Sequence, residues 1–153
     1  MATLSAGLLM YRVRGNVPEV LLVHPGGPYF RHKDAGAWTI PKGEAMPGED
    51  RLAAAQREFQ EETGLTPTGP FRPLEPVRQK GGKAVYAWAF AGDCDPATIT
   101  SNDFSMEWPP RSGTTVTFPE IDRAEFFDIP TAKTKINPAQ TAFLDELIEL
   151  LRR

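Results

Sequence analysis

Three glutamates, Glu58, Glu61 and Glu62, lie within five residues of one another. The sequence around them predicts a helix, and offsets of three and four residues bring side chains onto one face of a helix. Like charges that lie side by side repel one another. Because a hard divalent cation prefers oxygen ligands and would relieve this repulsion, the spacing predicts a metal site on that face.

The neighbouring residues indicate how such a helix would be held. Leu52, Ala55 and Phe59 repeat at helical spacing on a different face, and this apolar stripe would dock the helix on a core. Ala54 lies one turn before Glu58, and we expect this small residue to leave room for a ligand. The acidic face would then stay free for chemistry.

The glutamates belong to one longer run, GEAMPGEDRLAAAQREFQEETGL, from Gly43 to Leu65. This run resembles the Nudix box at every fixed position of that motif. The matching residues are Gly43, Glu49, Arg57, Glu58, Phe59, Glu61, Glu62, Gly64 and Leu65. By average composition, nine such matches arise by chance with a probability on the order of 10⁻⁹ per start position. A merely solvated acidic helix would not explain the spaced Gly, Arg and apolar residues.

The resemblance implies a reaction and roles for individual residues. Nudix enzymes cleave a diphosphate linked to another moiety, usually by water attack at phosphorus with Mg²⁺, or with Mn²⁺ as the alternative. The implied metal ligands are Glu58, Glu61, Glu62 and the carbonyl of Gly43. Arg57 is expected to orient a carboxylate through a two-pronged hydrogen bond, and Glu49 to stabilise the junction between loop and helix. The resemblance also implies that Arg57 and Glu61 act in catalysis.

In this family a further carboxylate often comes from a loop beyond the box. Glu120 is the candidate here, because it precedes the apolar segment Phe126–Asp128 much as such a residue does in some members. Glu107 and Asp122 are its rivals. The identity of the general base varies in the family, and the sequence leaves it open.

The positions of the basic residues predict where the phosphates of a substrate would lie. Lys42 directly precedes Gly43, and some polyphosphate-cleaving members share the Pro-Lys-Gly sequence. Arg78 and Lys80 lie in a predicted hairpin and are expected to bind substrate with Lys42. A charged hairpin can instead be a protected, soluble sheet edge. Five aromatic residues could stack on a base or form core: Tyr29, Phe30, Trp38, Tyr86 and Trp108.

The expected substrate is a nucleoside polyphosphate, either a dinucleoside polyphosphate or a nucleoside triphosphate. ADP-ribose-type members often carry a proline about fifteen residues after the box, where this chain has Lys80. The alternative within the family is an ADP-ribose or nucleotide-sugar pyrophosphatase. The alternative of another class is a non-catalytic nucleotide-sensing Nudix module, but such modules usually lose box carboxylates that are all present here.

Length and composition limit the other possibilities. A chain of 153 residues with 41% hydrophobic residues can bury one core, so we expect a single domain over residues 1–153. The net charge of −3 favours no stable nucleic-acid partner. The single cysteine, Cys94, excludes an internal disulfide and favours the reducing cytoplasm. The short apolar stretch near the N-terminus predicts neither a signal peptide nor a membrane span. The oligomeric state stays open.

Hydrophobic patterns predict the elements that would position these residues. We expect strands at Leu4–Val13, Glu19–His24, Trp38–Ile40, Leu74–Gln79, Ala84–Ala91 and Phe126–Asp128, with one more within Ile99–Trp108. We expect helices at Glu49–Thr63 and Pro138–Leu151. The patterns alone indicate α/β or α+β. The resemblance implies a Nudix-like α/β/α sandwich with a central mixed β-sheet.

Overall fold

A computed structural model describes residues 4–153. A seven-stranded mixed sheet forms its centre, with the path β4-β6-β1-β2-β9, β3 beside β1 and β5 beside β6. The strands are β1 (Leu4–Arg14), β2 (Val17–Pro25), β3 (Lys42–Glu44), β4 (Arg72–Pro73), β5 (Val77–Arg78), β6 (Ala84–Ala91) and β9 (Ile121–Asp128). Strands β1 and β6 run parallel, whereas the other pairs are antiparallel.

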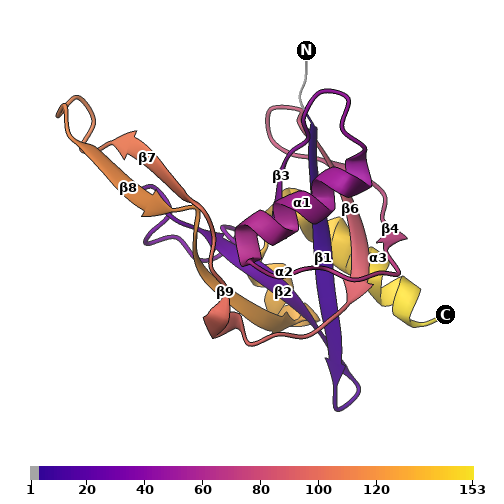
Figure 1. Ribbon diagram of the computed structural model, residues 1–153. Coiled ribbons are helices and arrows are strands. Elements are labelled where there is room, and N and C mark those ends of the chain that lie inside the picture. The colour runs from indigo at the N-terminus through magenta and orange to yellow at the C-terminus, as the bar shows by residue number, and fades with distance from the viewer. Residues whose placement is uncertain (1–3) are drawn as a thin grey trace.

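Helices cover both faces of this sheet. Helix α1 (Arg51–Thr63) crosses one face in front of β1, and α2 (Ile129–Lys135) and α3 (Thr141–Leu151) lie behind the sheet (Figure 1). Short 3₁₀ turns at Pro96–Thr98 and Pro138–Gln140 complete the helical elements of residues 4–153. Two apolar clusters fill the two sides, one under α1 and one between the sheet, α2 and α3. The expected sandwich with a central mixed sheet is confirmed.

A second, two-stranded sheet projects from the body. Strands β7 (Asp103–Glu107) and β8 (Thr115–Pro119) pair antiparallel and extend away from the central sheet (Figure 1). Phe104 and Phe118 face each other on its half-buried side, whereas Ser105 and Thr117 lie on the exposed side. The strand predicted within Ile99–Trp108 is present, but its partner β8 was not predicted.

Several element boundaries differ from the predictions. Helix α1 starts at Arg51 rather than Glu49, because the Asp50 side chain accepts from the Ala53 amide and caps it. The predicted strand Trp38–Ile40 forms only two isolated β-bridges, one between Thr39 and Val23 and one between Trp38 and Ile136. The helix predicted from Pro138 begins as a 3₁₀ turn and becomes α-helical at Thr141.

Two further predictions were incomplete or wrong. Strand β9 begins at Ile121, five residues before the predicted Phe126, and Asp128 then caps the unpredicted helix α2. Ala54 has no exposed surface and packs in the apolar cluster beneath α1, so it does not leave room for a ligand. A small residue is needed there because α1 lies directly on the sheet. In the part of the chain that the structure describes, no helix combines the length and the hydropathy required to span a bilayer.

Candidate active site

The end of β3 and one face of α1 meet at Gly43 and Glu58. Gly43 pairs with Ala6 of β1, which fixes β3 beneath the helix. A Cβ atom built at Gly43 would lie only 2.0 Å from Oε2 of Glu58. Only glycine therefore allows the backbone of β3 to approach this carboxylate so closely. The same contact explains in physical terms why the box spaces this glycine and glutamate fifteen residues apart.

Arg57 ties the glutamates of the site to the loop before the helix. Its Nε and Nη2 atoms donate to the two carboxylate oxygens of Glu49 at 2.9 and 3.0 Å, which is a two-pronged contact. Its Nη1 atom donates to Glu58 at 2.8 Å and to Glu61 at 3.2 Å. The guanidinium, helped by the Met46 amide, lowers the pKa of Glu49 to about 2. Glu49 is thus a fixed anion at the junction of loop and helix.

Glu62 is half-buried, and of the three glutamates it is the one whose charge is most strongly desolvated. Its Oε1 atom accepts a hydrogen bond from the backbone amide of Lys42 at 3.0 Å. The pKa of Glu62 is raised to about 8, chiefly by burial. The charges of Glu58 and Glu120 contribute to the rise, whereas the amide and the charge of Lys42 act against it. Burial likewise lowers the pKa of Lys42, whose ammonium group interacts with Glu62. An uncompensated negative charge at Glu62 is therefore costly.

Glu120 lies close enough to interact electrostatically with these carboxylates, although it is 58 residues beyond Glu62 in the chain. Its charge raises the pKa of both Glu58 and Glu62. Its own pKa is raised first by burial and then by Glu61 and Asp103. Burial is also the main cause of the raised pKa of Glu58, with Arg57 acting against it. The structure therefore brings Glu120 to the same side as the box glutamates.

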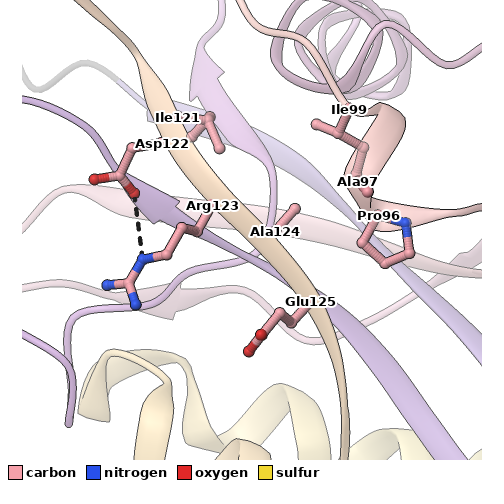
Figure 2. A pocket seen from close by; sticks show the side chains of 8 residues that line it. All are labelled: Pro96, Ala97, Ile99, Ile121, Asp122, Arg123, Ala124 and Glu125. Atoms are coloured by element: carbon pink, nitrogen blue, oxygen red, sulfur yellow. Dashed lines mark ion pairs between the residues drawn. The ribbon is translucent and has the colours of Figure 1, made fainter.

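The two rivals of Glu120 are engaged elsewhere. Glu107 accepts from the Arg111 amide at 2.7 Å, near the outer end of the β7–β8 hairpin. Asp122 lies 2.7 Å from Nδ1 of the buried His24. A cavity of about 270 Å³ beside β9 is lined by Asp122 and its neighbours Ile121 and Arg123, but by none of the box glutamates (Figure 2).

The chemistry of this donor set fits a divalent cation. Every side chain implied as a ligand offers carboxylate oxygen, which Mg²⁺ and Mn²⁺ prefer. A cation would also offset the cost of ionising the half-buried Glu62. Within residues 4–153, no three His, Cys, Asp or Glu side chains converge as a ready-made metal site. Instead, Arg57 holds the carboxylates of Glu58 and Glu61.

The predicted substrate-binding cations occupy different places. Lys42 lies beside Glu62 and lines a small pocket. Arg78 donates to the Gly82 carbonyl within its own turn, and Lys80 is exposed at that turn. Neither contacts the box glutamates. Lys83 comes nearer, because it pairs with Glu44 of β3 at 2.8 Å and its charge lowers the pKa of Lys42.

The pocket beside Lys42 has a volume of about 170 Å³. Its lining residues are Pro25, Phe30, Gly36, Ala37, Thr39, Lys42, Gln79 and Asn137. The buried Gln140 holds two of these lining residues in place, because its Nε2 atom donates to Thr39 and to Gln79 at 2.8 Å each. Sequence reasoning missed Gln79, Asn137 and Gln140. They come from separate parts of the chain, and no local pattern marks them as neighbours.

The aromatic candidates divide between core and surface. Trp38 is 1% exposed and packs edge-on against Phe127, so it belongs to the core. Phe30 lines the pocket beside Lys42. Tyr29 meets Trp108 of the hairpin with ring centroids 5.3 Å apart. Tyr86 lies under the guanidinium of Arg51, 4.1 Å from its ring centroid. Phe30 thus stands where a bound base next to Lys42 could contact it.

Comparison with known proteins places this architecture in a family. Bis(5'-nucleosyl)-tetraphosphatase (asymmetrical) of Caenorhabditis elegans is 39% identical over 66 residues, which cover 43% of this chain and 44% of that protein. The protein of the same description from Rattus norvegicus is 35% identical over 100 residues, covering 58% of this chain and 64% of the relative. The chain thus spans less than two thirds of either relative.

A solved structure agrees on the fold. The C. elegans Ap4A hydrolase binary complex superposes with a TM-score of 0.69 at 22% identity, covering 97% of this chain and 98% of that chain. The sequence profile of the NUDIX domain matches residues 1–147. With the complete box, the mixed sheet between helices and this match, the chain belongs to the NUDIX domain family.

Proposed function

We propose that this chain is a metal-dependent hydrolase that cleaves the diphosphate linkage of a nucleoside polyphosphate by water attack at phosphorus. The observation that carries the proposal is the half-buried Glu62, which interacts with Glu58 beside Gly43, in a complete box. A carboxylate buried at this cost, among others of the same sign, is typical of a site that works with a bound cation. The names of the two curated relatives support the phosphoanhydride substrate.

Glu58, Glu61, Glu62 and the Gly43 carbonyl would hold the divalent ion, which we propose to be Mg²⁺. When bound, such an ion neutralises phosphate oxygens and lowers the pKa of a bound water. Arg57 keeps the carboxylates of Glu58 and Glu61 oriented while Glu49 anchors Arg57 to the loop. The protein's own contribution is therefore a preset arrangement of anions.

Glu120 is our candidate for the group that accepts a proton from the attacking water, with Glu61 as its alternative. The raised pKa of Glu120 moves this carboxyl toward the range in which a general base works best at neutral pH. Its charge acts on both Glu58 and Glu62, which supports a place for Glu120 beside the proposed metal ligands.

We propose that Lys42 meets the phosphate chain and that the pocket beside it receives the nucleoside. Phe30 offers an aromatic face there, and the side chains of Gln79 and Asn137 offer amide groups for a base or sugar edge. The contacts of Arg78 and Lys80 support at most a role at the rim, where each cation contributes about 0–1 kcal/mol. A dinucleoside polyphosphate is favoured over ADP-ribose. The single cysteine supports action in the cytoplasm.

The test compares catalytic efficiency on diadenosine tetraphosphate, nucleoside triphosphates and ADP-ribose, each with Mg²⁺. Glu62→Gln serves as the inactive reference, and Glu125→Gln, an exposed change on β9, as the matched control. We expect diadenosine tetraphosphate to give the highest kcat/KM. A tenfold advantage for ADP-ribose would overturn the substrate assignment. Binding of these nucleotides without any hydrolysis would instead identify a nucleotide-sensing module.

A further inference from the structure

A buried histidine ties the end of β2 to the start of β9. His24 has no exposed surface. Its Nε2 atom lies 2.6 Å from the Lys33 carbonyl, which can only accept, so Nε2 carries a proton and donates it. Its Nδ1 atom lies 2.7 Å from Oδ1 of Asp122, and one proton must lie between these two atoms. His24 therefore joins the 25–36 loop to Asp122.

The segments on either side of this pair fit closely together. The register between β2 and β9 shifts after His24, so that Pro25 faces Ile121. Gly26 then donates its amide to the Glu120 carbonyl at 2.8 Å. A Cβ atom at Gly26 would lie 2.0 Å from the Pro119 carbonyl oxygen. β-Bulges often redirect a side chain next to a functional site, and this one lies beside Glu120.

The backbone of Glu120 is also held from the hairpin side. Its amide donates to the Asn102 carbonyl at 2.9 Å, and the Ile121 amide donates to Oγ of Ser101 at 3.0 Å. The side chain of Glu120 makes no hydrogen bond or ion pair with any residue of the described 4–153 range. Glu61 and Asp103 repel it. The position of this carboxylate therefore depends on the junction that holds its backbone.

Asp122 is fixed by more than His24 alone. Arg123 lies 3.8 Å from the same Oδ1 atom, as the dashed line in Figure 2 marks. The guanidinium of Arg123 also lies over the Trp38 ring, 5.2 Å from its centroid. Trp38 in turn packs edge-on against His24 with centroids 5.2 Å apart. These contacts hold His24 against Trp38 and place Arg123 beside Asp122.

We propose that His24 and Asp122 are positioning residues, which set the place of the Glu120 carboxylate by bracing the junction of residues 24–26 with residues 119–122. The inference rests on the catalytic role proposed for Glu120 above. Misplacing a catalytic group by about 1 Å can cost roughly 100-fold in rate. We therefore expect Asp122→Ala to lower kcat by about 10- to 100-fold with little change in KM.

Asp122→Asn provides the conservative counterpart. Its amide can donate to Nδ1 of a His24 whose proton stays on Nε2, so the link is kept without the charge. We expect this variant to recover most of the kcat lost in Asp122→Ala. Asp128→Ala is the matched control, because it removes an aspartate contact on the same strand, the cap of α2, away from the carboxylates. It should lower the midpoint of urea unfolding slightly and leave kcat unchanged.

A double-mutant cycle with Glu120→Gln decides whether the pair acts through Glu120. If it does, Asp122→Ala lowers kcat in the parent protein but causes no further loss in the Glu120→Gln background. An equal loss in both backgrounds, or no loss in the parent, would overturn the inference. His24→Gln, which loses the link to Asp122, repeats the cycle if Asp122→Ala does not fold.

The same set of variants separates failure of this inference from failure of the proposed function. If Glu62→Gln abolishes hydrolysis but Glu120→Gln does not lower kcat, the role of Glu120 is wrong and the positioning inference falls with it. If neither variant affects hydrolysis, the site itself is wrongly assigned. If both lower kcat and the Asp122 effect is additive, only the positioning inference is overturned.

Discussion

The half-buried Glu62 should make the stability of the metal-free protein depend on pH. Its pKa is raised to about 8 from an ordinary value near 4.5, chiefly because burial disfavours the ionised form. The charges of Glu58 and Glu120 add to this, and Lys42 opposes it. Replacing Glu62 with Gln keeps the shape and an oxygen for the Lys42 amide, but removes the ionisation. The variant therefore isolates the cost of the charge.

The direction of the pH effect follows from the linkage between protonation and folding. Below the unfolded pKa of about 4.5, Glu62 is protonated in both states and costs nothing. As the pH rises toward 8, the unfolded chain ionises freely while the folded protein resists, so wild type loses stability relative to Glu62→Gln. Each pKa unit is worth about 1.4 kcal/mol, which gives a loss of roughly 3 kcal/mol at pH 7 and at most roughly 5 kcal/mol above pH 8.

The assay is urea unfolding of both proteins in excess chelator at pH 5, 6, 7 and 8. Any fixed cost of fitting the glutamine amide cancels, because only the change of the difference with pH is used. Glu125→Gln, an exposed change, should show no such trend. In saturating Mg²⁺ the trend should shrink, because a bound cation favours the ionised form. A stability difference that stays constant from pH 5 to 8 in chelator would refute the reasoning.

Three further substitutions test the rest of the site. Gly43→Ala forces the Glu58 carboxylate away, because the new Cβ would lie 2.0 Å from it. The affinity for Mn²⁺, measured by electron paramagnetic resonance, should therefore fall at least about tenfold, and an unchanged affinity would contradict the importance of this contact. Lys42→Ala should lower kcat/KM for polyphosphate substrates by about tenfold or more, because it removes a cation from beside the phosphates. An unaltered kcat/KM would mean that Lys42 does not interact with the substrate. Arg57→Lys keeps the charge but not the two-pronged contact with Glu49, and should lower kcat about tenfold or more; full activity would mean that charge alone suffices.

The predictable parts of the molecule are those with strong local patterns. Helix α1 has periodic apolar residues and a glycine at its end, where Gly64 adopts the left-handed conformation with φ of 77°. The spacing of its glutamates follows directly from helix geometry. Strands β1 and β6 are long and apolar, and the glycine turn before β6 indicated the antiparallel pairing with β5.

The unpredicted parts depend on contacts between distant residues. Helix α2 is only seven residues long and contains Pro130, so it carries too little periodicity to be recognised. Strand β8 alternates polar and apolar residues but gains its identity from pairing with β7. The link between His24 and Asp122 joins residues 98 apart in sequence. Neither residue is unusual in its own segment, so no local pattern could have revealed the pair.

Metal dependence of hydrolysis tests the central claim most directly. The rate of diadenosine tetraphosphate cleavage is measured with fixed Mg²⁺ while chelator is added past equivalence, and Mg²⁺ is then restored. The carboxylate cluster of Glu58, Glu61 and Glu62 predicts that activity disappears with free Mg²⁺ and returns on its addition. Cleavage that continues at an unchanged rate in excess chelator would contradict the account.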